Sequence, residues 1–357
     1  MSIMKSVILM TSRTVGKLVH LTANLCHCCH RWTSSSTTAT VFLVFVIFVY
    51  LTFEIRFRHL SDQNRRLTSY DDKDTVVIYN RVPKTGSTSF TGLAYDLCDK
   101  NGFNVLHLNT SKNSHMMSLT DQLRFARNVS QWRERHPALI HGHIAYIDFG
   151  RLGVNQVKPI YINLIRKPLD RLVSYYYFLR NGDNFRPYVV RRRQGDKRTF
   201  DECVQHGEHD CNPENMWLQI PFFCGHIFEC WIPGNEWALA EAKRNLVDKY
   251  LIVGQTEQMH DFVAVLEVAL PKFFAGARRL YESGPKSHLR KTYNKLEPSA
   301  ETVAKIRESR VWQMENDFYE FAVKQFKFIR QRTLITIDDQ LVGKEQQFFF
   351  EKIRPKR

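Results

Sequence analysis

Residues 75–90 read Thr75-Val-Val-Ile-Tyr-Asn-Arg-Val-Pro-Lys-Thr-Gly-Ser-Thr-Ser-Phe90. The β-branched run 75–79 predicts a strand, and the segment 90–98 after the small-residue loop predicts a helix. A strand, a loop and a helix N-terminus in this order form an anion cradle, because backbone amides converge there and the helix dipole favours negative charge. Lys84 adds a full positive charge to the cradle.

This loop differs from a Walker A loop, because the order G-x-x-x-x-G-K-[ST] is absent. It therefore predicts a nucleotide that is bound without an obligatory metal, such as a phosphosulfate. The alternative interpretation is a surface turn that is simply rich in small residues.

A second strand-to-helix junction, at residues 159–180, repeats the arrangement. The apolar strand 160–165 ends in Arg166, and Pro168 suits the first turn of the following helix. Ser174 lies two helical turns beyond Arg166, so a guanidinium and a hydroxyl can hold one phosphate from two sides. Two such junctions predict a ligand with phosphates at both ends of a nucleoside.

Short apolar segments alternate with helical patterns along the rest of the chain, and no internal repeat is found. This alternation predicts an α/β fold with a doubly wound parallel sheet that is covered on both faces. Ligands in such sheets lie at the carboxyl ends of the strands, where both phosphate-binding junctions fall. The further strands are expected at 104–108, 138–147 and 250–254, and further helices at 118–134 and 260–270.

These motifs resemble those of the sulfotransferases that use 3′-phosphoadenosine 5′-phosphosulfate. Residues 81–89 are similar to their 5′-phosphosulfate loop, and residues 166–174 to their 3′-phosphate site. The resemblance is closest to the heparan sulfate 2-O-sulfotransferases and covers about residues 74–357. Lys167 departs from the pattern, since the family usually has an acid there. The other matching motifs are His141-Gly-His143, Val173-Ser-Tyr-Tyr-Tyr-Phe178, Trp217-Leu-Gln-Ile-Pro-Phe-Phe-Cys-Gly225 and Lys286-Ser-His-Leu-Arg-Lys-Thr292.

The resemblance implies a P-loop-like sulfotransferase fold and sulfuryl transfer from 3′-phosphoadenosine 5′-phosphosulfate, with no metal required. The implied acceptor is the 2-OH of a uronic acid in heparan sulfate, with iduronic acid favoured over glucuronic acid. A dermatan or chondroitin uronyl 2-O-sulfotransferase is the nearest alternative. The residues expected to bind the co-substrate, including three from a lid over the adenosine end, are Lys84, Thr85, Gly86, Ser87, Thr88, Ser89, Arg166, Ser174, Ser287, Arg290 and Thr292.

His141-Gly-His143 is the expected chemical centre, because a spacing of two on a strand places both imidazoles on one face. A histidine titrates near neutral pH and suits the base that takes the alcohol proton. The resemblance implies that His143 is that base, with His141 its partner or an alternative base, and we expect Lys84 to stabilise the leaving phosphate. The other interpretations are half of a metal site, which lacks a visible third ligand, or a histidine pair held in the core.

The net charge of +15 predicts an acidic partner, which is nucleic acid, an anionic membrane or a sulfated polysaccharide. No nucleic-acid-binding signature is found. The run Arg191-Arg-Arg193 follows the second junction. Such a charge run is usually a solvated surface, but the resemblance implies acceptor contacts in this region, and we expect Arg191 to contact the acceptor. The resemblance adds Arg81, Tyr95 and His107 on the acceptor side.

The N-terminal region predicts a type II membrane protein. We expect a cytosolic tail (1–36), a transmembrane signal anchor (37–53), a stem (54–73) and a lumenal sulfotransferase domain (74–357). Golgi residence is implied mainly by the resemblance. Features that suit a lumenal location are the sequons at Asn109 and Asn128 and the close cysteine pairs Cys203–Cys211 and Cys224–Cys230.

The cysteines at the end of the predicted cytosolic tail, Cys26, Cys28 and Cys29, suit palmitoylation or no role better than a metal site. At the other end of the chain, the segment 346–353 carries three phenylalanines. The resemblance implies a homotrimer, and this tail is the expected subunit contact.

Two other classes of protein share part of this pattern. A P-loop small-molecule kinase would share the sheet and the first loop, but its activity would depend on Mg²⁺. A non-catalytic glycosaminoglycan-binding lectin would share the positive charge, but it would not bind adenosine 3′,5′-bisphosphate.

Overall fold

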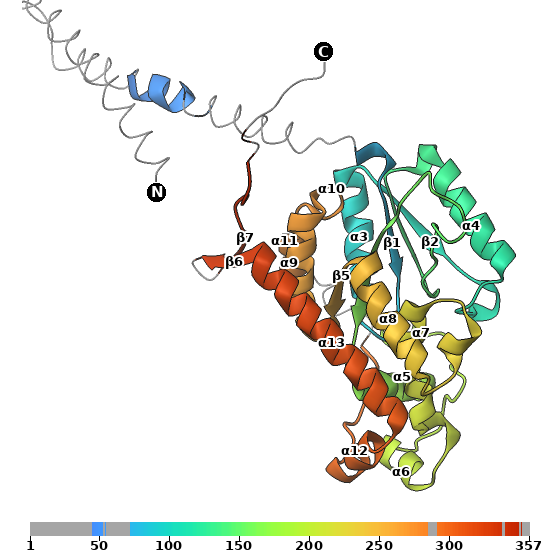
Figure 1. The fold of residues 1–357 in the computed structure, drawn as a ribbon. Coiled ribbons are helices and arrows are strands. Elements are labelled where there is room, and N and C mark those ends of the chain that lie inside the picture. Colours follow the sequence, from blue (N-terminus) through green and yellow to red (C-terminus); the bar gives the residue numbers. More distant parts are fainter. Residues whose placement is uncertain are drawn as a thin grey trace, which may run out of the picture. The chain divides into compact units, whose positions relative to one another are not determined.

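The computed structural model describes residues 45–52, 54, 72–284, 291–337, 340–349 and 351. The chain divides into two units, Met1–Tyr70 and Asp71–Arg357. In the first unit residues 45–52 are helical (Figure 1). Within the described ranges, no helix combines the length and the apolar character needed to cross a membrane. The predicted anchor lies partly outside these ranges, and the cysteines of the predicted tail lie wholly outside them.

The second unit is built on a parallel sheet, of which Figure 1 labels β1, β2 and β5. Its strand order is β2-β3-β1-β4-β5. The predicted parallel α/β sheet is therefore confirmed. The chain runs from β1 outward to β2, returns to β3, and then crosses to β4 on the other side of β1. The sheet thus changes winding direction between β1 and β4, which is where ligands bind in such folds. The strands are β1 (Val76–Asn80), β2 (Asn104–Leu108), β3 (Ala138–Gly142), β4 (Ile160–Ile165) and β5 (Tyr250–Gln255).

Helices cover both faces of the sheet because successive strand residues point to opposite sides. Val76 and Ile78 of β1 belong to one buried cluster, whereas Val77 and Tyr79 belong to the other. The first cluster includes side chains of α4 (Leu119–Gln131), α5 (Pro168–Asn181), α7 (Gln219–Cys224), α8 (Glu236–Lys249) and α12 (Ala300–Arg307). The second includes those of α3 (Ser87–Asn101), α9 (Met259–Ala269), α10 (Pro271–Phe274) and α11 (Ala277–Ser283).

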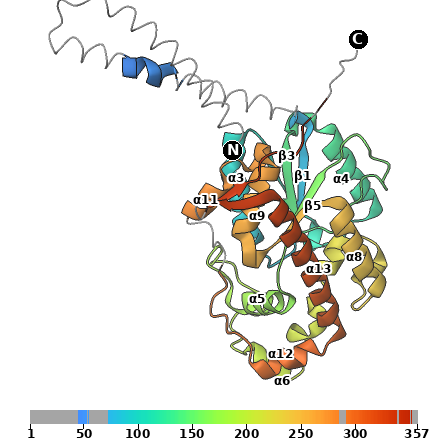
Figure 2. The same cartoon turned by 60° about the vertical axis from the view of Figure 1, so that its left-hand side comes forward.

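The long helix α13 (Arg310–Thr333) contributes side chains to both clusters and packs against β5, α8 and α9 (Figure 2). After it, β6 (Leu334–Ile337) and β7 (Gln340–Gly343) form an antiparallel hairpin. A further short helix, α6 (Phe200–Gln205), follows α5.

A buried pair of amide side chains joins β1 to β4 near the carboxyl ends of both strands. The Asn163 amide donates to the Asn80 carbonyl at 2.8 Å and to the Asn80 side-chain oxygen at 3.0 Å. Tyr250 of β5 donates to the same side-chain oxygen at 3.0 Å. Because buried amides are costly unless hydrogen-bonded, this network favours one register of β1, β4 and β5.

Strand β3 is shorter than the 138–147 segment predicted for it, because the chain leaves the sheet after Gly142. The next amides pair elsewhere: Ala145 N–H donates to the His115 carbonyl, and Tyr146 N–H to the Phe222 carbonyl. A side chain at Gly142 would lie 2.7 Å from the Leu108 carbonyl oxygen, so this position requires glycine. The prediction that His141 and His143 share one strand face therefore fails.

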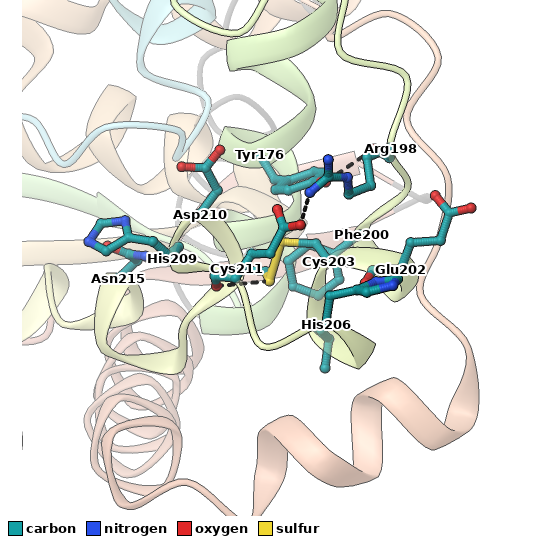
Figure 3. Close-up of a disulfide and its surroundings, with 12 residues drawn as sticks. Tyr176, Arg198, Phe200, Glu202, Cys203, His206, His209, Asp210, Cys211 and Asn215 are labelled. Carbon is teal, nitrogen blue, oxygen red and sulfur yellow. Dashed lines mark hydrogen bonds and ion pairs between the residues drawn. A yellow bond between two sulfur atoms is a disulfide. The ribbon is translucent and has the colours of Figure 1, made fainter.

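Disulfides join Cys203 to Cys211 and Cys224 to Cys230. The first connects α6 with the short turn that carries Asp210 (Figure 3). Asp210 pairs with Arg180 near the end of α5, at 3.1 Å, and with Arg193 at 3.0 Å. The disulfide holds α6 against this turn, and the Asp210 ion pair holds the turn against α5, so α6 is linked to α5.

We predict that Cys203→Ala with Cys211→Ala lowers the free energy of unfolding by about 2–3 kcal/mol, because the unfolded chain regains the freedom of the closed loop. Urea unfolding of the full chain, followed by tryptophan fluorescence, measures this change. Cys98→Ala is the control, since Cys98 is half-buried and not disulfide-bonded. A double variant no less stable than this control would contradict the prediction.

Candidate active site

The first junction is a tight loop between β1 and α3. Lys84 and Gly86 both have positive φ, 68° and 74°, and Gly86 caps α3. A side chain at Gly86 would lie 3.1 Å from Met259 and 3.2 Å from Thr256, so this cap position has two reasons to be glycine. The buried Thr85 donates its hydroxyl to the Val82 carbonyl at 2.9 Å, which closes the turn.

Both junctions open onto one cavity of about 270 Å³. The first junction places the N-terminus of α3 at this cavity, where the helix dipole favours an anion. The second contributes a guanidinium and a hydroxyl from α5 and the end of β4. The lining residues are Pro83, Lys84, Gly86, Ser87, Thr88, His143, Arg166, Ser174, Tyr175, Phe178 and Thr256.

Arg166 lies directly after β4, and its side chain reaches back to the first junction. Its Nη1 donates to the Lys84 carbonyl at 3.4 Å, and its backbone N–H donates to the Gln219 side chain at 2.9 Å. Pro168 occupies the first turn of α5, as the sequence predicts. The neighbouring Lys167 side chain is exposed and does not line the cavity.

Lys84 projects towards the second junction. Its Nζ donates to the Thr292 hydroxyl at 3.1 Å and lies 4.3 Å from the centre of the Phe178 ring. The guanidinium of Arg191 lies 4.4 Å from the same ring centre and 3.8 Å from the buried Asp183 carboxylate. The Phe178 ring thus contacts both the Lys84 ammonium, which lines the cavity, and the Arg191 guanidinium, which the sequence predicts to contact the acceptor.

His143 lines the cavity from the bend after β3. Its Nδ1–H donates to the Arg81 carbonyl at 2.8 Å, so the lone pair of the neutral ring is on Nε2. His115 donates to the His143 carbonyl at 3.1 Å and fixes the backbone at this bend. The cavity therefore contains a proton acceptor, His143 Nε2, together with the cations Lys84 and Arg166.

His141 lies in a different environment, within a cluster of the residues predicted for the acceptor side. Its Nε2 is 3.0 Å from the Tyr95 hydroxyl, and its ring stacks on His107 at 4.6 Å. Arg81 Nη2 donates to His107 at 3.0 Å. Burial first, and then the charge of Arg81, lower the pKa of His141 to about 3, so this imidazole is neutral at pH 7.

Several predicted site residues lie elsewhere. Thr85 and Ser89 are buried beside the cavity without lining it. Ser287 and Arg290 lie outside the described residues. The sequon asparagines, Asn109 and Asn128, line a larger cavity of about 630 Å³ between β2 and α4, away from both junctions; Asn109 is exposed and Asn128 half-buried. In the described part of the chain, no group of three or more His, Cys, Asp or Glu side chains could hold a metal.

Sequence reasoning missed four lining residues: Pro83, Tyr175, Phe178 and Thr256. Three of them lie inside motifs that were already recognised. Thr256 directly follows β5, and its hydroxyl donates to the Ile165 carbonyl at 3.0 Å. Its place at the carboxyl end of a predicted strand was the available signal.

The fold and the cavity define an α/β protein in which two strand-to-helix junctions and a histidine line one cavity. The profile of the sulfotransferase family matches residues 68–322, and the chain belongs to this family. It is therefore an enzyme of the sulfotransferase class.

Individual relatives are similar over most of their length. Heparan sulfate 2-O-sulfotransferase 1 of Xenopus laevis is 58% identical over 304 residues, and that of Gallus gallus 57% over 304 residues. In both cases the aligned region covers 85% of each chain. Heparin sulfate O-sulfotransferase of Drosophila melanogaster is 56% identical over 298 residues, which cover 83% of this chain and 84% of that protein.

His226 generates a prediction about pH. Its Nδ1 accepts from Met117 N–H at 3.1 Å and its Nε2–H donates to the Ala145 carbonyl at 3.2 Å, so the ring is neutral. Burial lowers its pKa to about 4, below the unfolded value of about 6.5. The unfolded chain binds more protons between these values, so stability is complete above the unfolded pKa and falls as pH drops towards the folded one.

We therefore predict that urea unfolding shows a loss of stability as pH falls from about 7 to about 5. His226→Gln should reduce the proton uptake on unfolding by about one proton, since glutamine can both donate and accept without titrating. Equal slopes of stability against pH for the parent and the variant would contradict this assignment.

Proposed function

We propose that the chain transfers a sulfuryl group from 3′-phosphoadenosine 5′-phosphosulfate to the 2-OH of a uronic acid in heparan sulfate. The observation that carries the proposal is the single cavity that joins Lys84, Arg166 and His143. Membership of the sulfotransferase family supports the sulfuryl donor, and the names of the relatives support the acceptor.

The residues at the cavity fit the two anionic ends of this co-substrate. Gly86, Ser87 and Thr88 would hold the 5′-phosphosulfate at the N-terminus of α3. Arg166 and Ser174 would hold the 3′-phosphate from the strand end and the helix. Ser287, Arg290 and Thr292 would bind the adenosine end, as the resemblance implies. When bound, the co-substrate supplies the activated sulfuryl group, and no metal is required.

His143 acts as the base in this proposal. The Arg81 carbonyl holds Nδ1–H, so Nε2 receives the proton of the acceptor hydroxyl. The Lys84 ammonium stabilises the negative charge that develops on the departing phosphate. His141 is a neutral neighbour that orients Tyr95 and His107 rather than a second base, because its ring lies in their cluster.

The acceptor is held by basic and aromatic side chains beside the cavity. Arg81, Tyr95 and His107 form one group, and Arg191 reaches the cavity from the other side through Phe178. These cations suit the carboxylate and sulfate groups of the polysaccharide. Iduronic acid is the favoured acceptor, and disaccharide analysis after reaction tests it against glucuronic acid and against dermatan or chondroitin sulfate.

We also propose a Golgi location, with a type II signal anchor at 37–53 and the catalytic unit in the lumen. The two disulfides suit that compartment, and Asn109 and Asn128 would be the glycosylated residues. The homotrimer would form through the C-terminal tail, where Phe348 and Phe349 are 63% and 84% exposed.

Arg166→Ala should weaken binding of adenosine 3′,5′-bisphosphate by about 10- to 100-fold, because it removes charge-assisted hydrogen bonds to the 3′-phosphate. Binding of adenosine 5′-phosphate should change far less. Calorimetric titration of both nucleotides into the full chain measures the difference. Equal weakening of the two would mean that the 3′-phosphate binds elsewhere.

His143→Ala should abolish 2-O-sulfation of heparan sulfate and leave nucleotide and heparin affinities within a few-fold of the parent. A general base contributes mainly to the transition state, so kcat falls while binding remains. Disaccharide analysis measures the product, and calorimetry measures both affinities. His141→Ala is the matched comparison and should damage acceptor binding more than kcat. A His143 variant that sulfates at near-parental rates would remove this residue from the mechanism.

A further inference from the structure

A buried carboxylate lies beneath the second junction, on helix α13. The Glu315 side chain is completely buried, and the mechanism above gives it no role. Its oxygens accept three hydrogen bonds from one turn at the start of α7. The donors are Leu218 N–H at 2.9 Å, Ile220 N–H at 3.1 Å and the Gln219 side-chain amide at 3.2 Å. All of these neighbours donate, which suits an ionised carboxylate.

The Gln219 amide lies between this carboxylate and the second junction. Its Nε2 donates to Glu315 and its Oε1 accepts from Arg166 N–H at 2.9 Å. Because the ionised Glu315 can only accept, it determines which way round the Gln219 amide lies. The amide oxygen is consequently turned towards Arg166. A continuous chain of hydrogen bonds therefore runs from α13 through α7 to the end of β4.

A second buried charge accompanies Glu315. Arg171, on α5, is almost fully buried and donates to the Met216 carbonyl at 2.8 Å, just before the same turn. Burial raises the pKa of the Glu315 carboxyl, and the charge of Arg171 is the largest effect that opposes this rise. The Glu315 carboxylate thus offsets the positive charge of the buried Arg171, close to the junction that also carries Arg166.

We propose that Glu315, acting through Gln219, is a positioning residue for Arg166. The inference rests on the proposed function, in which Arg166 binds the 3′-phosphate of the nucleotide. Gln219 holds the backbone from which the guanidinium extends, and small displacements at a binding group are costly. Loss of the chain of hydrogen bonds therefore weakens the 3′-phosphate contact and leaves the 5′ end of the nucleotide in place.

The test exchanges the two side chains. In Glu315→Gln alone, the NH₂ group of the new amide faces the NH₂ group of Gln219, so two donors meet. If the Gln219 amide turns over to avoid this, its own NH₂ group faces Arg166 N–H instead. In Gln219→Glu alone, two carboxylates face each other. In the double variant, the oxygen of the new amide accepts from Leu218 and Ile220, and its NH₂ donates to the new carboxylate. The other carboxylate oxygen accepts from Arg166 N–H, so every hydrogen bond is restored.

The measured quantity is the ratio of the dissociation constants of adenosine 5′-phosphate and adenosine 3′,5′-bisphosphate, by calorimetry on the full chain. Each single variant should lower this ratio about tenfold, with adenosine 5′-phosphate affected less than about twofold, because each breaks the chain of buried hydrogen bonds that joins Glu315 to Arg166. The double variant should return to within about threefold of the parent. Asp317→Asn is the control, since Asp317 lies on the same helix in an exposed ion pair with Lys243 and should keep the parental ratio.

A Glu315→Gln variant that keeps the parental ratio overturns the proposal, as does one that weakens both nucleotides equally. A double variant no better than the single ones overturns it too. If Glu315→Gln does not fold, Gln219→Met must lower the ratio by itself. The parent chain is measured first. If it shows no preference for the nucleotide with a 3′-phosphate, the nucleotide assignment itself is wrong.

Discussion

The hydrogen bonds between Asn80 and Asn163 are the interaction on which the site depends. They join β1 to β4 inside the sheet, where Val77, Ile78 and Tyr79 lie opposite Ile160, Tyr161 and Ile162. A slip of one residue would bury unpaired amides and turn every β4 side chain to the opposite face. The register therefore determines how far Arg166 lies from the loop of Lys84, and with it the separation of the two proposed phosphate contacts.

The sheet and both junctions could be predicted from sequence because their signals are local. β-branched runs mark the strands, Pro168 marks the start of α5, and the ranges expected for β2 and β4 are those observed. The loops that follow the strands lie at the carboxyl ends of the sheet, which is where ligands bind in parallel α/β sheets. Lys84, Arg166, Ser174 and His143 line one cavity at this end of the sheet.

The remaining features depend on contacts between segments that are distant in sequence. Strand β3 ends early because its next amides find partners at His115 and Phe222, and no local pattern reveals such partners. His141 and His143 therefore differ in surroundings despite their spacing. Glu315 is similarly hidden, since a glutamate in an amphipathic helix ordinarily reads as a solvated residue. Its hydrogen bonds to residues 218–220 are evident only in the folded structure, where α13 packs against this turn.

The position of Glu315 late in the chain has a consequence for biosynthesis. All five strands of the parallel sheet are translated before α13, so a growing polypeptide can pair its strands while one face of β5 still lacks its covering helix. Until α13 arrives, the turn at 218–220 has no carboxylate and apolar side chains remain open to other chains. The hydrogen bonds beneath Arg166 are thus completed only when α13 packs against β5, α8 and α9, and a polypeptide truncated before α13 would leave apolar side chains of these elements exposed.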